Sequence, residues 1–147
     1  MLVSQMIGKA RERLATIRWD SPVRAAAALM SKPHVELVVV CDSHGKMVGV
    51  LAKTDIVGQI SSCAGNSCIT GVDAIMTRQV VACRERDWVE DAWARMKEHG
   101  LPRLPVVDGE DRPIGILYAR DVLQAMLSKA EDQESLLRDY VMGIGYR

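Results

Sequence analysis

Hydrophobic and polar positions along the first half of the chain change period from segment to segment. A short apolar strand at Thr16-Ile17 leads into a turn, and apolar residues then recur at helical spacing over residues 23–30. Two further apolar runs, 37–41 and 47–51, are joined by a connection rich in turn-forming residues, which predicts a hairpin. Another helix is expected to begin near residue 55. This half therefore predicts the element order βαββα.

The second half repeats the same pattern at an offset of 66 residues. Residues 15–60 align with residues 81–126 without a gap, and ten of the 46 pairs are identical. The predicted elements of this copy are a strand at 80–83, a helix with apolar positions at 89, 92, 93 and 96, strands at 104–107 and 114–117, and a helix from about residue 121. Two copies are too few for a solenoid. The sequence therefore predicts an α/β (α+β) fold in which two βαββα units form a pseudo-twofold pair.

The repeat also predicts how the chain is divided and how its helices begin. Ser21 and Pro22 are expected to be the N-cap and first residue of the first long helix, and Asp87 is expected to cap its counterpart. The apolar tail 140–147 is expected to dock on its own domain or on a second subunit. The predicted parts are a helical N-terminal flank at 1–14 that can lie across the first strand, repeat 1 at 15–62, a linker at 63–75, repeat 2 at 76–128, and a C-terminal helix and tail at 129–147.

Composition and charge argue against several function classes. A hydrophobic content of 48% is enough for one compact domain with a real core. Nineteen Lys and Arg residues balance nineteen Asp and Glu residues, so no broad basic face is expected for nucleic acid or anionic lipid. The N-terminus is charged where a signal peptide is apolar, and no later segment approaches a membrane span. We therefore expect a cytoplasmic protein that binds neither nucleic acid nor membrane.

The cysteines and histidines suggest neither a metal site nor catalysis. Cys41 and Cys83 end apolar runs and are expected to be small buried hydrophobes. Cys63 and Cys68 lie in a polar stretch with four residues between them, rather than the two usual for zinc, and are expected to be reduced and dispensable. The three histidines fall in predicted turns or connectors, and no nucleophile stands beside an obvious base. We expect no metal, no required cofactor and no enzymatic activity.

The ends of the two hairpins carry a family resemblance. The second reads Leu104-Pro105-Val106-Val107-Asp108 and then Gly115-Ile116-Leu117-Tyr118-Ala119-Arg120-Asp121, and Gly49 to Asp55 form a weaker copy. These segments resemble the signature of cystathionine β-synthase (CBS) domains, and the resemblance covers residues 14 to 127. It implies a Bateman module, a disc of two repeats with two clefts between them. Such modules commonly bind adenosine-containing ligands and dimerise, so a homodimer is expected.

The acid that ends each signature, Asp55 or Asp121, is the first candidate for ligand binding. An ionised carboxylate can accept hydrogen bonds from both vicinal hydroxyls of a ribose. Alternatively, each acid caps free N–H groups in the first turn of a helix. Since the same acid recurs at the same place in both halves, both interpretations stay open.

The chain departs from the family pattern three positions before each acid. Family members usually have Ser or Thr there, whereas this chain has Ala52 and Tyr118. Each cleft therefore lacks one hydroxyl that helps to hold the sugar. Tyr118 can stack on an adenine ring, or it can fill and block the second cleft while the small Ala52 leaves the first one open.

Further contacts are implied by the resemblance alone. Arg103 precedes the strand of the second copy, where the first copy has Leu37, and it would point toward the phosphate of a nucleotide whose ribose Asp121 holds. The alternative for Arg103 is a surface guanidinium in a polar connector. The other residues implied for the Asp121 cleft are Arg120, Tyr118, Ile116, Ala15, Val35 and Glu36, and those implied for the Asp55 cleft are Lys53, Thr54, Val50, Val81, Leu101 and Pro102. The apolar members of both sets are equally well explained as core.

These features predict a regulatory module that binds an adenine nucleotide and changes shape to act on an unidentified protein target. AMP or ATP is favoured over S-adenosylmethionine because Arg103 suits a phosphate. The alternative is a dimerising structural adaptor whose clefts are vestigial. Charge asymmetry predicts that binding depends more on Asp121 than on Asp55, but a Tyr118 side chain that fills the second cleft would reverse this order.

Overall fold

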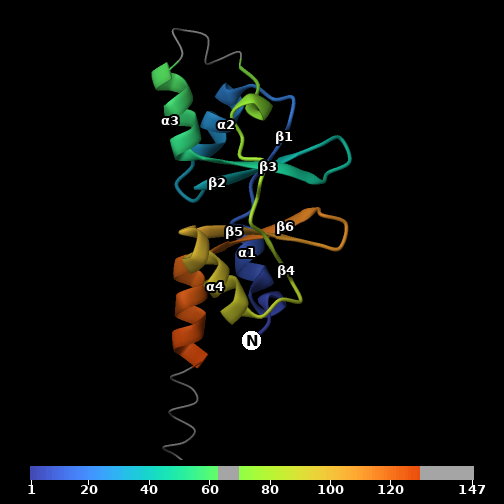
Figure 1. Cartoon of the computed structure of the whole chain (residues 1–147), viewed down its shortest axis with the longest axis vertical. Helices are drawn as coiled ribbons and strands as arrows, with labels where there is room; N and C mark the ends of the chain where they lie inside the picture. Colours follow the sequence, from blue (N-terminus) through green and yellow to red (C-terminus); the bar gives the residue numbers. More distant parts are fainter. Residues whose placement is uncertain (63–69, 130–147) are drawn as a thin grey trace, which may run out of the picture.

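A computed structural model describes residues 1–62 and 70–129 of the chain, and it has two similar units stacked along its long axis (Figure 1). The first unit contains β1 (Thr16–Arg18), α2 (Val23–Met30), β2 (Leu37–Cys41), β3 (Met47–Ala52) and α3 (Lys53–Ser62). The second contains β4 (Cys83–Arg84), α4 (Val89–His99), β5 (Arg103–Val107), β6 (Pro113–Tyr118) and a helix over 119–129. Both units have the order βαββα, and β2 and β3 begin 66 residues before β5 and β6. The predicted fold class is confirmed.

Each unit has a three-stranded mixed sheet in which the middle strand joins a parallel and an antiparallel neighbour. The strand orders are β1-β2-β3 and β4-β5-β6. In the first sheet Leu37 is paired with Ala52, and in the second Arg103 is paired with Tyr118. Because side chains alternate between the faces of a strand, one face of each sheet covers its own helices and the other faces the opposite sheet. The register therefore places these two pairs at equivalent positions in the two units.

Apolar side chains form one core within each unit and a third between the sheets. Val38 and Val40 pack against α2 and α3 in the first unit, and Leu104 and Val106 occupy the corresponding core of the second. The third cluster consists of Leu37, Val39, Ile116 and Tyr118. Val39 and Ile116 have no exposed surface, so the two sheets bury each other without an intervening layer.

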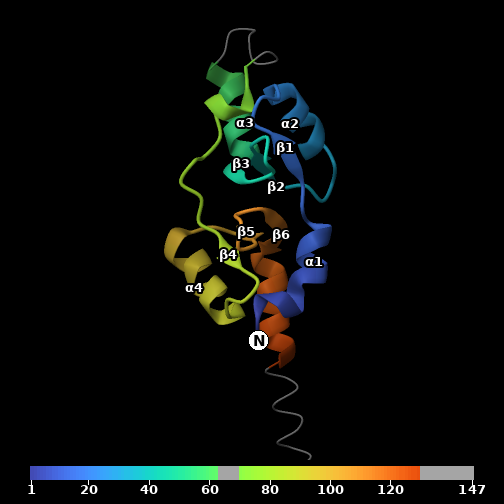
Figure 2. The same cartoon turned by 90° about the vertical axis from the view of Figure 1, so that its right-hand side faces the viewer.

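Each unit is completed by a segment from outside its own βαββα stretch (Figure 2). The N-terminal segment, η1 (Val3–Met6) and α1 (Ile7–Glu12), packs on the second unit, and Val3 N donates to Asp87 O over 2.8 Å. The segment that contains η2 (Val72–Ala74) does the same for the first unit, where Val72 N donates to Ser21 O over 2.9 Å. The expectation that residues 2–14 lie across the first strand is therefore wrong, since their helix covers β6 instead.

The close approach of these segments explains both signature glycines. A Cβ atom at Gly115 would lie 2.8 Å from Ala10 Cβ and 2.9 Å from the Ala10 carbonyl carbon. A Cβ atom at Gly49 would lie 2.9 Å from the Thr77 carbonyl oxygen. Both distances are shorter than van der Waals contact, so only glycine lets α1 lie on β6 and residue 77 lie on β3.

The same segments correct the predicted helix caps and one strand. The N-caps are Pro22 and Trp88, and neither makes a side-chain cap bond. Instead, Val23 N donates to Thr70 O and Val89 N donates to Met1 O, so distant carbonyl groups satisfy the N–H groups that Ser21 and Asp87 were expected to cap. The predicted strand at 80–83 begins only at Cys83 in the structure, and Val80 and Val81 line a cavity instead. Within the described ranges, no helix has the length and apolar character needed to cross a membrane.

Candidate ligand clefts

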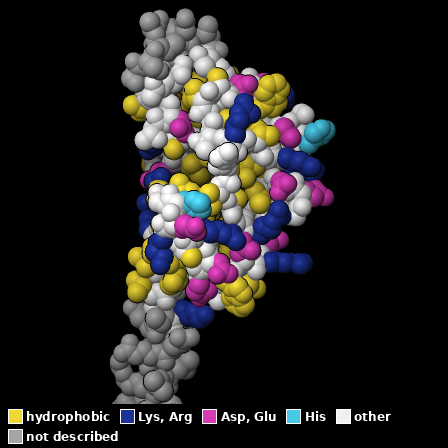
Figure 3. Space-filling model, viewed as in Figure 1, with side chains coloured by type: hydrophobic (Ala, Val, Ile, Leu, Met, Phe, Trp, Pro, Cys, Tyr) yellow, Lys and Arg dark blue, Asp and Glu magenta, His cyan; other side chains and the backbone are white. Residues whose placement is uncertain are grey.

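A cavity of about 210 Å³ lies between the two units beside Asp55. We call it the first cleft; its lining residues are Leu37, Val50, Ala52, Thr54, Asp55, Thr77, Gln79, Val80, Val81, Leu101, Arg103 and Pro105. The structure thus brings together five residues that the sequence assigned to one cleft: Val50, Thr54, Asp55, Val81 and Leu101. Lys53 and Pro102 were assigned to the same cleft but do not line this cavity. Figure 3 shows apolar side chains exposed at the waist between the units and mixed charges over the hairpins.

Asp55 combines the two roles that the sequence left open for it. One carboxylate oxygen, Oδ2, accepts a hydrogen bond of 2.8 Å from the backbone N–H of Ala52 and so stabilises the start of α3. The same side chain lines the first cleft. No cation pairs with it among the residues that the structure describes. Its capping role therefore leaves the second oxygen, Oδ1, available for a polar group in the cleft.

Tyr118 takes the equivalent position in the second unit, and its side chain is only 2% exposed. Its hydroxyl group donates to His34 O over 2.9 Å and accepts from Glu36 N over 3.3 Å. The ring packs between the sheets with Ile116 and Leu37. We call the space beside Asp121 the second cleft. Tyr118 fills it from β6, whereas the small Ala52 leaves the first cleft open.

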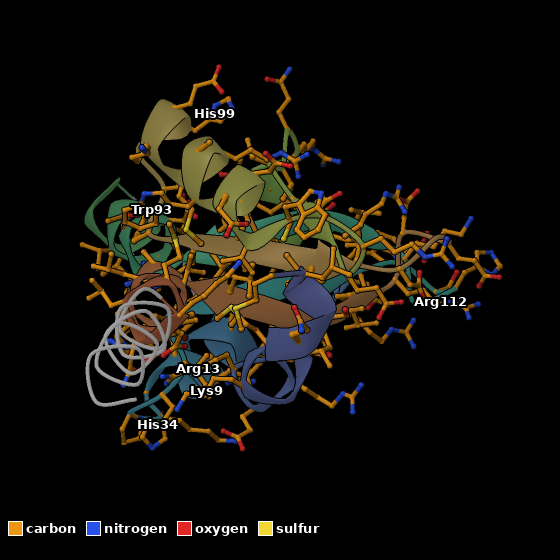
Figure 4. The ribbon with its side chains drawn as sticks, turned by 90° about the horizontal axis from the view of Figure 1, so that it is seen from below. Lys9, Arg13, His34, Trp93, His99 and Arg112 are labelled. Carbon is orange, nitrogen blue, oxygen red and sulfur yellow. The ribbon has the colours of Figure 1, made fainter. Side chains whose placement is uncertain are left out.

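Asp121 is held by an arginine that the sequence analysis did not identify. Arg13 Nε lies 3.2 Å from Asp121 Oδ2, and Arg13 Nη2 lies 3.4 Å from Oδ1. The two side chains are only 14% and 10% exposed. The Arg13 guanidinium also lies over the Tyr118 ring, 4.6 Å from its centroid. Arg13 follows α1, outside the repeat, so no pattern in the sequence connects it with Asp121; Figure 4 shows it on the same side of the molecule as His34.

Glu36 lies beside Tyr118 as well, and cations surround its carboxylate. Arg103 Nε and Nη2 lie 2.8 Å and 2.6 Å from Glu36 Oε2, and Arg120 Nη1 lies 4.0 Å from Oε1. Burial acts to raise the pKa of Glu36, but the hydrogen bond and charge of Arg103, with the charges of Arg120 and Lys53, outweigh it and leave the pKa below its usual value. Glu36 is therefore ionised at neutral pH. We call Arg13, Glu36, Arg103, Tyr118, Arg120 and Asp121 the Tyr118 cluster.

The remaining residues assigned to the Asp121 cleft lie in cores. Ala15 and Val35 are partly buried against the core of the first unit, and Ile116 is fully buried between the sheets. None of them lines the first cleft. Burial in the core accounts for all three side chains.

Three pairs of positions at the 66-residue offset, two within the repeat and one just before it, explain why one cleft is open and the other filled. Tyr118 corresponds to Ala52, so a ring stands where the first cleft has a methyl group. Arg13 corresponds to Gln79, which lines the first cleft without a charge. Glu36 corresponds to Pro102, which lacks the N–H group that would bind a tyrosine hydroxyl.

The thiols that the structure describes are free and do not belong to a metal site. Burial raises the pKa of Cys83 to about 12, and burial together with Asp42 also raises the pKa of Cys41. Residues 1–62 and 70–129 contain no group of three metal-ligating side chains. Cys63, Cys68 and the tail 140–147, about which the sequence made predictions, lie outside the described residues.

Comparison with curated proteins shows relatives that are much longer than this chain. Homoserine O-acetyltransferase of Methanococcoides burtonii is 32% identical over 111 residues, which cover 76% of this chain and 22% of the relative. Inosine-5'-monophosphate dehydrogenase of Methanocaldococcus jannaschii is 31% identical over 109 residues, which cover 74% of this chain and 21% of the relative. The chain therefore spans about a fifth of these relatives.

Solved structures and a family model agree on the architecture. The CBS domain pair of protein MJ0100, in complex with 5'-methylthioadenosine and S-adenosyl-L-methionine, has a TM-score of 0.73 at 25% identity, covering 88% of this chain and 98% of that one. The cytosolic domain of the Mg²⁺ channel MgtE, in complex with ATP, has a TM-score of 0.65 at 26% identity, covering 77% and 45%. The CBS domain model matches residues 7–62 and again residues 72–128. This chain therefore belongs to the CBS domain family and carries a tandem pair of these domains.

Proposed function

We propose that the chain is a regulatory module that binds an adenine nucleotide in the first cleft and transmits its occupancy to a protein partner. The observation that carries the proposal is the open cavity beside Asp55. The equivalent space beside Asp121 in the second unit is filled by the buried Tyr118 side chain. The related structures support the ligand class, since 5'-methylthioadenosine, S-adenosyl-L-methionine and ATP all contain adenosine.

The lining of the first cleft suits the parts of a nucleotide. Val50, Val81 and Leu101 offer an apolar wall for the base, and the second oxygen of Asp55 can accept hydrogen bonds from ribose hydroxyls. A volume of about 210 Å³ is below the usual range of roughly 300–1,000 Å³ for pockets that enclose a whole drug-sized ligand. We therefore expect the nucleoside inside the cavity and the phosphate at its mouth, where Arg103 supplies positive charge.

Because the second cleft is filled, we infer that ligand binding depends on Asp55 more than on Asp121. A ligand at Asp121 would have to displace the Arg13 guanidinium and the Tyr118 ring, which is almost completely buried. A ligand at Asp55 meets no such obstacle. We therefore propose that each chain binds one nucleotide, at Asp55. This replaces the prediction from charge asymmetry that binding depends more on Asp121.

An exposed apolar surface supports self-association. Two helices, α3 and the helix over 119–129, lie on the same side of the molecule in Figure 1. Their exposed large apolar residues are Val57, Ile60, Leu123 and Leu127. We propose that this surface joins two copies in a homodimer, because single exposed apolar residues are common on surfaces, whereas two helices that carry several of them on one side of the molecule are not. Light scattering tests it, since a mass near 16.2 kDa at micromolar concentration would reject the dimer.

Calorimetric titration of AMP, ATP and S-adenosylmethionine tests the ligand proposal. The Asp55→Asn substitution keeps a capping oxygen for Ala52 N but removes the charge, and we expect roughly tenfold weaker binding or more. The Ala52→Tyr substitution places in the first cleft the ring that fills the second, and we expect it to abolish binding. The matched control Asp121→Asn should leave binding within about twofold of the wild type.

Circular dichroism should first show that each variant is folded. If none of the three compounds binds to the wild type, the chain is better described as a dimerising adaptor with vestigial clefts. If Asp121→Asn abolishes binding while Asp55→Asn retains it, the nucleotide occupies the second cleft and the steric argument is wrong.

A further inference from the structure

Arg103 stands on a wall that both clefts share. It is one of the residues that line the first cleft, while its guanidinium lies 5.6 Å from the centroid of the Tyr118 ring. It is also the β5 partner of Tyr118 in the sheet, so the two side chains project from neighbouring strands. A change in the position of Arg103 therefore affects the first cleft and the Tyr118 cluster together.

The charges around Arg103 allow it to change partners. The Tyr118 cluster contains three arginines and two carboxylates, which leaves one net positive charge. Lys53 adds a further positive charge near Glu36. If Arg103 leaves Glu36, Arg120 and Lys53 still balance that carboxylate. The side chains of Arg103 and Glu36 are also 28% and 25% exposed, so water can replace part of what each loses.

We propose that Glu36 is an internal counter-anion for Arg103, and that an anionic group on a ligand in the first cleft replaces it. The inference rests on the proposed function and names the ligand class more narrowly, as nucleotides that carry phosphate. In this arrangement Glu36 sets the affinity for the phosphate and does not contribute to the affinity for the nucleoside. Arginine suits the exchange because its planar guanidinium binds carboxylate and phosphate in the same geometry.

The exchange also provides a route from the first cleft to the second. The backbone N–H of Glu36 donates to the Tyr118 hydroxyl, and the same hydroxyl donates to His34 O. When Arg103 turns to a phosphate, the Glu36 side chain loses its closest partner, and the connection between α2 and β2 loses an anchor on the Tyr118 cluster. Phosphate binding in the first cleft therefore loosens the residues that fill the second cleft.

The test compares the affinities of adenosine and AMP, because these two compounds differ only in the phosphate. In Glu36→Gln the competitor is removed, so AMP should bind about three- to tenfold more tightly, while adenosine changes by less than about twofold. In Arg103→Gln, AMP should bind about tenfold more weakly, with adenosine again unchanged. The matched control is Glu110→Gln, which breaks the exposed 3.0 Å pair between Glu110 and Arg112 and should change neither affinity.

A second variant and a second measurement test the inference even if Glu36→Gln does not fold. Arg120→Gln removes the other arginine beside Glu36, so Glu36 should hold Arg103 more firmly and AMP should bind about two- to threefold more weakly. Hydrogen exchange of wild-type peptides that contain residues 34–36 should become faster with AMP but not with adenosine.

The outcomes separate this inference from the function on which it rests. Suppose that both compounds bind and that neither Glu36→Gln nor Arg120→Gln changes the ratio of the AMP affinity to the adenosine affinity. Glu36 then does not compete with phosphate, and the inference is wrong while the proposed function stands. A ratio that changes only in Arg103→Gln has the same meaning, since Arg103 would then contact phosphate without leaving Glu36. Failure of both compounds to bind the wild type would reject the proposed function itself.

Discussion

The substitution Gly115→Ala tests whether α1 and β6 are packed as closely as the structure describes. The new Cβ atom would lie 2.8 Å from Ala10 Cβ and 2.9 Å from the Ala10 carbonyl carbon, about half an ångström or more inside van der Waals contact. The second of these atoms belongs to the helix backbone, so a change of rotamer cannot relieve the overlap. The substitution therefore forces α1 to move away from the sheet.

The expected loss of stability is moderate. Overpacking of this kind costs about 1–3 kcal/mol, and the lower entropy of the unfolded chain on replacing glycine by alanine returns about 0.4–1 kcal/mol. With the middle of each range, the net loss is roughly 1–2 kcal/mol in the free energy of unfolding. For a chain of 147 residues, 1 kcal/mol corresponds to a shift in Tm of about 2–4 °C. We expect Gly115→Ala to lower Tm by about 2–8 °C.

Scanning calorimetry of Gly115→Ala and Gly109→Ala measures the effect against a matched control. Gly109 lies in the turn between β5 and β6, and a Cβ atom there would meet nothing within 4 Å. Only the entropy gain of about 0.4–1 kcal/mol applies to the control, which should therefore melt about 1–4 °C above the wild type. If the two variants have the same Tm, α1 does not press on Gly115, and the account of this glycine is wrong.

Three further predictions concern buried charges and a thiol. Arg13→Ala leaves Asp121 without its cation, so urea unfolding should show a loss of about 2–4 kcal/mol; a loss no larger than that of Arg18→Ala, at an exposed pair, would contradict this. The lowered pKa of Glu36 means that its stabilising contribution is complete above about pH 4.3 and disappears as the pH falls through the lowered value. Urea unfolding of Glu36→Gln should therefore approach the wild-type stability in acid, and a stability gap that is constant with pH would refute it. Since burial raises the pKa of Cys83 to about 12, iodoacetamide at pH 8 should label it only after unfolding, as peptide mass mapping can show, and rapid labelling of the native protein would contradict the burial.

The order of elements and the position of Asp55 could be predicted because both depend on local patterns. The continuous apolar runs of β2 and β5 reflect strands that are buried on both faces, and the helical spacing of α2 and α4 reflects one buried face. The 66-residue repeat shows that this occurs twice. The turn residues between β2 and β3 are equally local. These features are therefore contained in stretches of a few consecutive residues.

The caps of α2 and α4 could not be predicted in this way. Pro22 and Trp88 make no side-chain cap bonds, because the carbonyl groups of Thr70 and Met1 reach the first N–H groups of the two helices. A preference for Ser or Asp at the N-cap assumes that the helix start depends on its own neighbours. Here segments distant in the chain supply the acceptors, so the local preference had no effect.

Sequence by itself determined the βαββα repeat, the family resemblance and the acid of each cleft, since each follows from residue type and spacing along the chain. Only the tertiary structure decided that Tyr118 is buried against Glu36 and His34, and that Arg13 holds Asp121. The tertiary structure also decided that the first cleft is open, since residues of both units line it. The physical reason is that the filling of a cleft depends on side chains from segments as much as 108 residues apart, and their meeting depends on how the two units pack.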